Sequence, residues 1–311
     1  MSTYRVTKAT TTLETFDVEA ESEAEAVAEV SSAQGTLVAQ NAAWSAVLIG
    51  GDPAPEPVAC PTGFGVYLRR ISGGSSDASV VAARCVKAGI DWAHLMVESS
   101  DGYVTSPSTR SVWAKAFRDA GINVGVWSFP GDARSASVQE SVSAANLLCE
   151  AAAEIDALSV MVNIEKPYKG KSAETVALCD TVYAATNEHS YFCGVVSYPI
   201  PSYHPDLNWD AMRGFEFASP MFYQTAQDAA LVSRGMSEWQ KLVPLLAPSL
   251  DGWSGSGVEG AARFQSDIIR VCGEPIDPLV PGAIVWSESQ MDDAKRAVTR
   301  RMADEYGWPR P

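Results

Sequence analysis

After residue 62, hydrophobic and polar positions follow two periodic patterns that alternate along the chain. Short apolar runs typical of buried strands are separated by longer segments in which apolar residues recur every three to four positions, as on one face of a helix. The predicted strands are 65–71, 92–98, 123–129, 159–165, 192–198, 217–223, 243–249 and 283–287. The predicted helices are 77–88, 108–120, 135–154, 172–187, 226–241, 257–272 and 292–306.

Strict alternation of strands and helices predicts an α/β protein with a parallel sheet that is covered by helices. Two near-identical joints, Ala88-Gly89-Ile90 and Ala120-Gly121-Ile122, place a glycine between a helix and the next strand. An open doubly wound sheet would produce the same alternation. The number of strands favours a (β/α)8 TIM barrel over residues 63–311.

Residues 1–50 read as a separate small α+β unit. The stretches 4–7 and 12–18 alternate as strands do, and Ser22 with Glu25 forms a capping-box pattern that opens a helix to about Ser31. Residues 36–49 then read as one or two further strands. A ββαβ unit of this size has a thin core, so we expect it to serve in anchoring or assembly. Residues 51–62 form a Pro-rich linker.

Composition excludes several classes of partner. A formal net charge of −15 opposes binding to nucleic acid. No apolar run is long enough to span a membrane, and the N-terminus lacks a signal-peptide pattern, which predicts synthesis in the cytoplasm. The six cysteines are scattered without a C-x-x-C pair, and the three histidines lack ligand spacing. We therefore expect reduced cysteines, no metal and no cofactor.

The fourth predicted strand carries the strongest chemical signal. Its alternation sends Val160, Val162 and Ile164 toward the helices and directs Asn163 and Glu165 into the barrel. In this fold the reacting groups lie at the carboxyl ends of the strands. An acid at that position is costly without a task or a partner, so Glu165 is the first catalytic candidate, with an ion pair to a nearby lysine as the structural alternative.

Other acids and aromatic residues also fall at or just beyond predicted strand ends. The additional acids are Glu98, Asp251 and Glu288, each of which has a solvated loop or helix cap as its alternative role. Aromatic faces next to carboxylates suit sugar rings, which stack on the ring and hydrogen-bond to the acid, although large aromatics can also simply close a barrel. The candidate ligand-binding residues are Asn163, Trp127, Tyr168, Tyr198, Tyr223, Gln224, Trp253 and Trp286.

The motif Asn163-Ile164-Glu165, followed by Lys166-Pro167-Tyr168-Lys169-Gly170, resembles the D-x-E motif that ends the fourth strand of the lysozyme-type (family 25-like) glycoside hydrolase barrels and their phage-encoded relatives. The resemblance covers about residues 63–306 and implies that Glu165 is the general acid. The first acid of the motif is replaced by Asn163. The acids that the resemblance implies on the first and sixth strands are replaced by Tyr67-Leu68-Arg69-Arg70 and Met221-Phe222-Tyr223-Gln224.

Two functions from different classes follow. One is a hydrolase of cell-wall or capsular polysaccharide, such as peptidoglycan, in which Asp251, Glu288 or Glu98 is the second carboxylate, or Asn163 orients a substrate N-acetyl group that acts as nucleophile. The other is a non-catalytic tail or capsid protein of a phage that binds glycans or neighbouring virion proteins, through residues 1–50 among others. A weaker third alternative is a metabolic enzyme that holds a phosphate at residues 252–257.

Overall fold

The computed structural model describes residues 2–8, 14–20, 44–48, 62–69, 71–72, 74–131, 136–189, 191–252, 255–273 and 280–306. The chain divides into two compact units, Met1–Pro57 and Val58–Pro311. In the first unit an antiparallel sheet has the order β2-β1-β3. Its strands are β1 (Ser2–Lys8), β2 (Glu14–Ala20) and β3 (Trp44–Leu48). The helix predicted over 22–31 lies outside the described residues.

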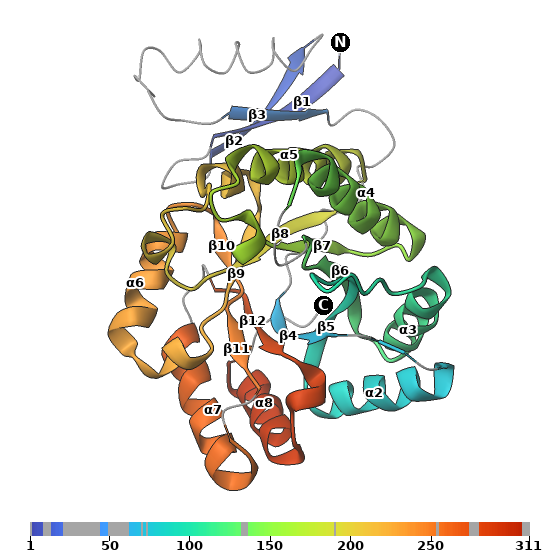
Figure 1. The fold of residues 1–311 in the computed structure, drawn as a ribbon, viewed down its shortest axis with the longest axis vertical. Helices are drawn as coiled ribbons and strands as arrows, with labels where there is room; N and C mark the ends of the chain where they lie inside the picture. Colours follow the sequence, from blue (N-terminus) through green and yellow to red (C-terminus); the bar gives the residue numbers. More distant parts are fainter. Residues whose placement is uncertain are drawn as a thin grey trace. The chain divides into compact units, whose positions relative to one another are not determined.

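The second unit is built on one sheet of nine parallel strands (Figure 1). The strands are β4 (Gly63–Leu68), β5 (Ile90–Glu98), β6 (Asn123–Ser128), β7 (Ser159–Asn163), β8 (Phe192–Ser197), β9 (Phe217–Pro220), β10 (Leu245–Leu246), β11 (Ser249–Asp251) and β12 (Gly282–Trp286). Their order in the sheet is β10-β9-β8-β7-β6-β5-β4-β12-β11. Every predicted strand has an observed counterpart, and the architecture is α/β and TIM-barrel-like.

The seventh predicted strand is observed as two pieces, β10 and β11. β10 pairs with β9, and β11 pairs with β12. The first and the last strand in the sheet order therefore both come from residues 245–251. Pro248 lies between the pieces and has no N–H to donate to a ladder. Its carbonyl still accepts a hydrogen bond from Ile284 N at 2.9 Å. The predicted strand is therefore interrupted at a proline while it keeps contact with both neighbouring strands.

Helices follow the strands around the outside of the sheet (Figure 1). They are α2 (Ser75–Lys87), α3 (Pro107–Asp119), α4 (Val138–Glu154), α5 (Ser172–His189), α6 (Ala229–Trp239), α7 (Gly257–Cys272) and α8 (Asp293–Tyr306). Ser137 and Glu140 form a complete capping box at the start of α4. Gly89 and Gly121 have φ values of 70° and 77° after α2 and α3, as the two Ala-Gly-Ile joints predict. Among the described residues, no helix has the length and apolar character that crossing a membrane requires.

Two hydrophobic cores lie on opposite faces of the sheet. The outer core joins the sheet to the helices and includes Val160, Val162 and Ile164. The inner core fills the space that the curled sheet encloses, and consists of Tyr67, Met96, Trp127, Met161, Val196, Phe217, Met221, Ala247 and Ile284. The alternation predicted for the fourth strand is therefore correct. It brings the residues after Met161 to the carboxyl-terminal edge of the sheet, on the inner side.

Candidate functional site

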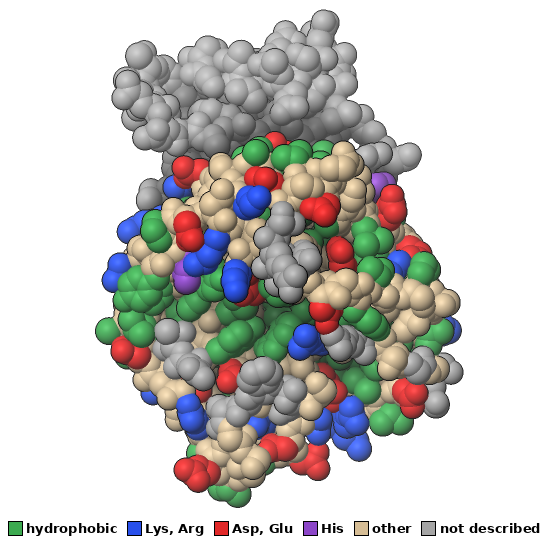
Figure 2. Space-filling view, in the orientation of Figure 1, with side chains coloured by type: hydrophobic (Ala, Val, Ile, Leu, Met, Phe, Trp, Pro, Cys, Tyr) green, Lys and Arg blue, Asp and Glu red, His purple; other side chains and the backbone are tan. Residues whose placement is uncertain are grey.

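A cavity of about 630 Å³ opens at the carboxyl ends of the strands. It is lined by Arg69, Ser99, Ser100, Trp127, Phe129, Asn163, Glu165, Tyr198, Pro199, Met221, Tyr223, Asp251 and Trp286. In the space-filling view a hollow with hydrophobic walls lies near the middle of this face of the second unit (Figure 2). Because these residues follow six or more different strands, the cavity exists only when the sheet is assembled.

The structure brings seven of the twelve predicted site residues to this one cavity. They are Trp127, Asn163, Glu165, Tyr198, Tyr223, Asp251 and Trp286. Glu98, Tyr168 and Glu288 lie elsewhere, and the side chain of Gln224 and all of Trp253 fall outside the described residues. The placement of each residue is a structural result, whereas its catalytic or binding role remains a prediction.

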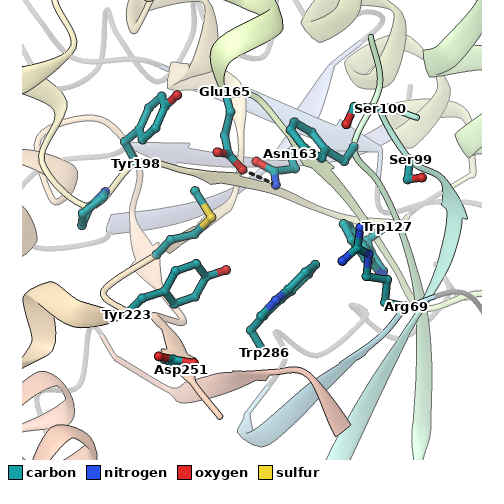
Figure 3. A pocket seen from close by; sticks show the side chains of 13 residues that line it. Arg69, Ser99, Ser100, Trp127, Asn163, Glu165, Tyr198, Tyr223, Asp251 and Trp286 are labelled. Carbon is teal, nitrogen blue, oxygen red and sulfur yellow. Dashed lines mark hydrogen bonds between the residues drawn. The ribbon is translucent and has the colours of Figure 1, made fainter. Parts of the chain in front are cut away.

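Glu165 follows β7 and points into the cavity (Figure 3). Its Oε1 accepts a hydrogen bond from Asn163 Nδ2 at 2.7 Å. Burial raises the pKa of the Glu165 carboxyl above its usual value, and the hydrogen bond from Asn163 opposes that rise. Among the described residues it makes no ion pair with Lys166 or Arg69, so the structural alternative for this glutamate is not observed. A carboxyl in this state stays protonated to higher pH than an exposed glutamate does, which suits proton donation.

Asn163 supplies the polar partner of Glu165 and carries an unused acceptor. The side chain is only 4% exposed. Its Oδ1 is buried and has no hydrogen-bond partner among the described residues. A buried acceptor without a donor is unfavourable, so this atom is suited to a ligand N–H or O–H group.

Tyr223 connects the two acids of the cavity. Burial raises its pKa well above the usual value, with smaller contributions from Tyr67, Glu165 and Asp251. Its ring extends into the cavity between the two carboxyls (Figure 3). Asp251 ends β11, and its Cα is paired with that of Trp286 on β12. Of the three acids considered as a second carboxylate, only Asp251 shares the cavity with Glu165.

Three aromatic rings pack together beside the cavity, of which Trp127 and Trp286 line it and Tyr67 belongs to the inner core. The ring centroids of Trp127 and Trp286 are 5.1 Å apart, and Tyr67 lies 5.3 Å from Trp127 and 5.4 Å from Trp286. The rings meet at steep angles, so each supports the others edge to face. This cluster combines the two alternatives that the sequence left open, because it fills the barrel and also presents apolar surface to the cavity.

Glu288 is held by arginines away from the cavity. Arg84 binds it through two hydrogen bonds, of 3.0 and 3.1 Å, and Arg296 Nη2 donates a third of 3.0 Å. The carboxylate is buried and borders a separate cavity of about 320 Å³. Its position at a strand end is as predicted, but these ion pairs give it a structural task. A catalytic role for Glu288 stays a prediction that these contacts do not favour.

Glu98 and Tyr168 also lie outside the main cavity. Glu98 borders a cavity of about 270 Å³ beside α4, and burial raises the pKa of its carboxyl. Tyr168 is buried, and burial raises its pKa to about 12. It packs under the chain near Gly131 rather than toward the barrel mouth. The reason is local, since Tyr168 belongs to a 3-10 turn, Lys166–Tyr168, whose direction differs from that of β7.

Arg69 is the main lining residue that our assignment of site residues missed. A signal for it exists in the sequence, because Tyr67 faces the inner core and alternation places Arg69 on the same side. Ser99 and Ser100, which follow β5, also line the cavity and were not predicted. Phe129, Pro199 and Met221 contribute apolar lining that nothing in the local sequence distinguishes from core.

Residues 252–257 were considered above as a phosphate site at the start of α7. In the structure a carboxylate of the protein, that of Asp292, binds there. Asp292 Oδ2 accepts a hydrogen bond from the backbone N of Gly257 at 2.9 Å. Asp292 Oδ1 accepts a hydrogen bond from Lys295 N and so caps α8. A carboxylate thus already lies at the start of α7, which leaves little reason for a phosphate there. Among the described residues, no cluster of three or more His, Cys, Asp or Glu side chains could hold a metal ion.

No protein-family model matches the sequence, and a search of curated proteins gave no match. Solved structures do match the fold. A family 39 glycoside hydrolase from Bacteroides cellulosilyticus WH2 has a TM-score of 0.55 at 11% identity, covering 85% of this chain and 69% of its own. A GH18 chitinase from Pseudoalteromonas aurantia has a TM-score of 0.54 at 12% identity, with 78% and 99% covered.

A xylanase and amylase inhibitor protein, XAIP-III, also matches, with a TM-score of 0.52 at 13% identity and with 79% of this chain and 97% of that chain covered. At these identities the likeness concerns the fold alone. The same architecture therefore occurs both in glycoside hydrolases and in a protein described as an inhibitor of hydrolases, so activity has to be argued from the site. The chain has a glycoside-hydrolase-like TIM-barrel fold.

Proposed function

We propose that this protein is a glycoside hydrolase that acts on a cell-wall or capsular polysaccharide, with Glu165 as general acid. The observation that carries the proposal is the setting of Glu165. It lies in an open cavity at the carboxyl ends of the strands, beside aromatic side chains. Burial raises its pKa, and among the described residues it makes no ion pair. Such a carboxyl is protonated at higher pH than usual and can donate its proton to a glycosidic oxygen.

The second reacting group is either Asp251 or the substrate itself. Glycosidases ordinarily use two carboxyl groups, and Asp251 is the other acid in the cavity. Substrate-assisted enzymes use an N-acetyl oxygen as nucleophile instead. The unpartnered Oδ1 of Asn163 could accept the N–H of such a group and orient it. A GH18 chitinase among the similar structures is consistent with an N-acetylated sugar as substrate.

The setting we propose is a phage virion, in which residues 1–50 connect the hydrolase to other virion proteins. It is supported only by the sequence resemblance to phage-encoded relatives and by the separation of a small N-terminal unit from the rest of the chain. The first unit contains a three-stranded antiparallel sheet, a form that readily pairs with a further strand at an open edge.

Hydrolysis by Glu165 is tested with the full chain on peptidoglycan and on capsular polysaccharides, by release of reducing ends. Glu165→Gln should lower the rate by about 100- to 10,000-fold, as loss of a general acid does. Asp251→Asn distinguishes the two mechanisms. It should abolish the reaction if Asp251 is the second carboxylate, whereas a substrate-assisted enzyme should keep most of its rate and fail on de-N-acetylated substrate.

A non-catalytic glycan-binding protein is the second candidate, and one observation favours it. Asn163 occupies the place where the resemblance implies an acid, and an amide cannot stabilise positive charge on the sugar as a carboxylate does. If wild-type protein releases no reducing ends but binds saccharides in calorimetry, and Trp286→Ala weakens that binding, this second function replaces the first.

A further inference from the structure

Arg69 is the only cation among the thirteen residues that line the main cavity. The other charged residues there are Glu165 and Asp251. Arg69 follows β4, and its side chain is exposed. Within the part of the chain that the structure describes, it makes neither an ion pair nor a hydrogen bond. The guanidinium therefore has its full set of donors available.

Arginines on the first two β/α units and on the last helix differ from Arg69, because they form ion pairs. Arg84 and Arg296 both bind Glu288, and Arg110 pairs with Glu154 at 2.6 Å. Glu165 accepts a hydrogen bond from Asn163, and among the described residues neither acid of the cavity forms an ion pair with Arg69. In a chain of net charge −15, acidic partners are abundant, so an arginine left unpaired at a cavity wall stands out.

Arg69 is placed to contact a ligand that extends beyond Glu165. It lies beside Trp127, on the opposite side of the cavity from Tyr198 (Figure 3). It also borders the second cavity of about 320 Å³, which Trp113 and Arg84 line as well. A saccharide with one unit over Trp127 and Trp286 would therefore bring its next unit against Arg69.

We infer that Arg69 determines specificity for a carboxylate-bearing saccharide, by binding the carboxylate of the sugar unit next to the one at Glu165. This inference rests on the proposed function. Arginine presents a planar fork of donors that matches a carboxylate in two parallel hydrogen bonds. The acidic surface of the protein does not attract anions from a distance, so the selectivity arises from this contact.

The carboxylate has two possible sources that share this chemistry. One is the lactyl group of N-acetylmuramic acid in peptidoglycan, and the other is a hexuronic acid in a capsular polysaccharide. The geometry of Arg69 favours neither, so the experiment includes both. The neutral counterparts are the lactyl methyl ester of the first and a hexose oligosaccharide for the second.

Binding is measured by calorimetry on the full chain carrying Glu165→Gln, so that no hydrolysis occurs. The disaccharide of N-acetylglucosamine and N-acetylmuramic acid is compared with its methyl ester, and a hexuronate oligosaccharide with the neutral hexose oligomer. In one of the two pairs the free carboxylate should bind about five- to tenfold more tightly, and less so at high salt, because the site is partly exposed. The pair that shows the difference identifies the source.

Substitutions at position 69 then assign the effect. Arg69→Gln should remove the preference while the neutral ligand binds as before, and Arg69→Lys should retain part of it. Lys166→Gln is the matched control, because Lys166 is exposed and follows Glu165 but does not line the cavity. Three outcomes overturn the inference and leave the proposed function intact. In the first, the preference for the free carboxylate survives Arg69→Gln; in the second, Lys166→Gln reduces this preference as much as Arg69→Gln does. In the third, the charged and neutral saccharides of both pairs bind equally. Absence of binding to all four saccharides overturns both.

Discussion

Glu165 and Glu288 both follow a strand of the same sheet, yet their surroundings are opposite. Glu288 comes after β12 and receives three hydrogen bonds from two arginines. Glu165 comes after β7 and receives one from a neutral amide, in a cavity with aromatic walls. Two arginines compensate the charge of the first carboxylate, whereas burial raises the pKa of the second.

This difference shows how the fold separates structural acids from acids available for chemistry. An ionised carboxylate inside a protein needs charged partners or hydrogen-bond donors. Arg84 of α2 and Arg296 of α8 meet at Glu288 and so join the first and last β/α units of the second unit of the chain. The elements that border Glu165 bring serines, tyrosines and tryptophans instead. Substitutions at the two positions should therefore separate stability from activity.

The largest effect on stability is expected at Glu288. Glu288→Gln leaves two arginines without their shared partner, and should lower the free energy of unfolding by about 1–3 kcal/mol, less than for a fully buried pair because Arg84 is half exposed. Urea denaturation measures this change. Glu305→Gln, at an exposed pair with Arg301, is the control and should cost at most about 0.5 kcal/mol. Equal effects of the two would mean that the Glu288 cluster has no structural role.

A smaller effect is expected at the amide beside Glu165. Asn163→Asp removes the donor that stabilises the ionised form of Glu165 and adds a like charge, so the pKa of Glu165 should rise further. Because a general acid works while it is protonated, the upper limb of the pH profile of kcat/KM should move to higher pH. An unmoved limb would indicate that another group is the acid.

The smallest effect concerns the stability cost of Glu165 itself. The pKa of the Glu165 carboxyl is higher in the folded protein than in the unfolded chain. Its contribution to stability is therefore fully present at pH values below the pKa of the unfolded chain, and it is lost as the pH rises through the pKa of the folded protein. Glu165→Gln has no such dependence. Its Tm relative to wild type should therefore increase between about pH 4 and neutrality. A variant that becomes less stable than wild type over this range would contradict the assigned surroundings of Glu165.

The sequence by itself determined the class of fold and the face on which each strand residue lies. Among the described residues of the second unit, hydrophobic periodicity located the strand segments and the α-helices, although it took β10 and β11 for one strand. Alternation along Ser159–Asn163 correctly separated outward valines from inward Met161 and Asn163. These features are local, since period and side-chain direction depend only on neighbouring residues. The break at Pro248 was visible in the same way but was not used.

The tertiary structure decided which strand-end residues meet. Seven predicted site residues converge, whereas Glu288, Glu98 and Tyr168 do not, although all three also follow strands. Where each of these side chains lies depends on residues far away in the chain. Arg84, for example, is separated from Glu288 by 204 positions. It also showed Arg69 at the wall of the cavity, where no described residue pairs with it. A sequence shows where a charge lies along the chain, but only the packed elements determine whether another charge neutralises it.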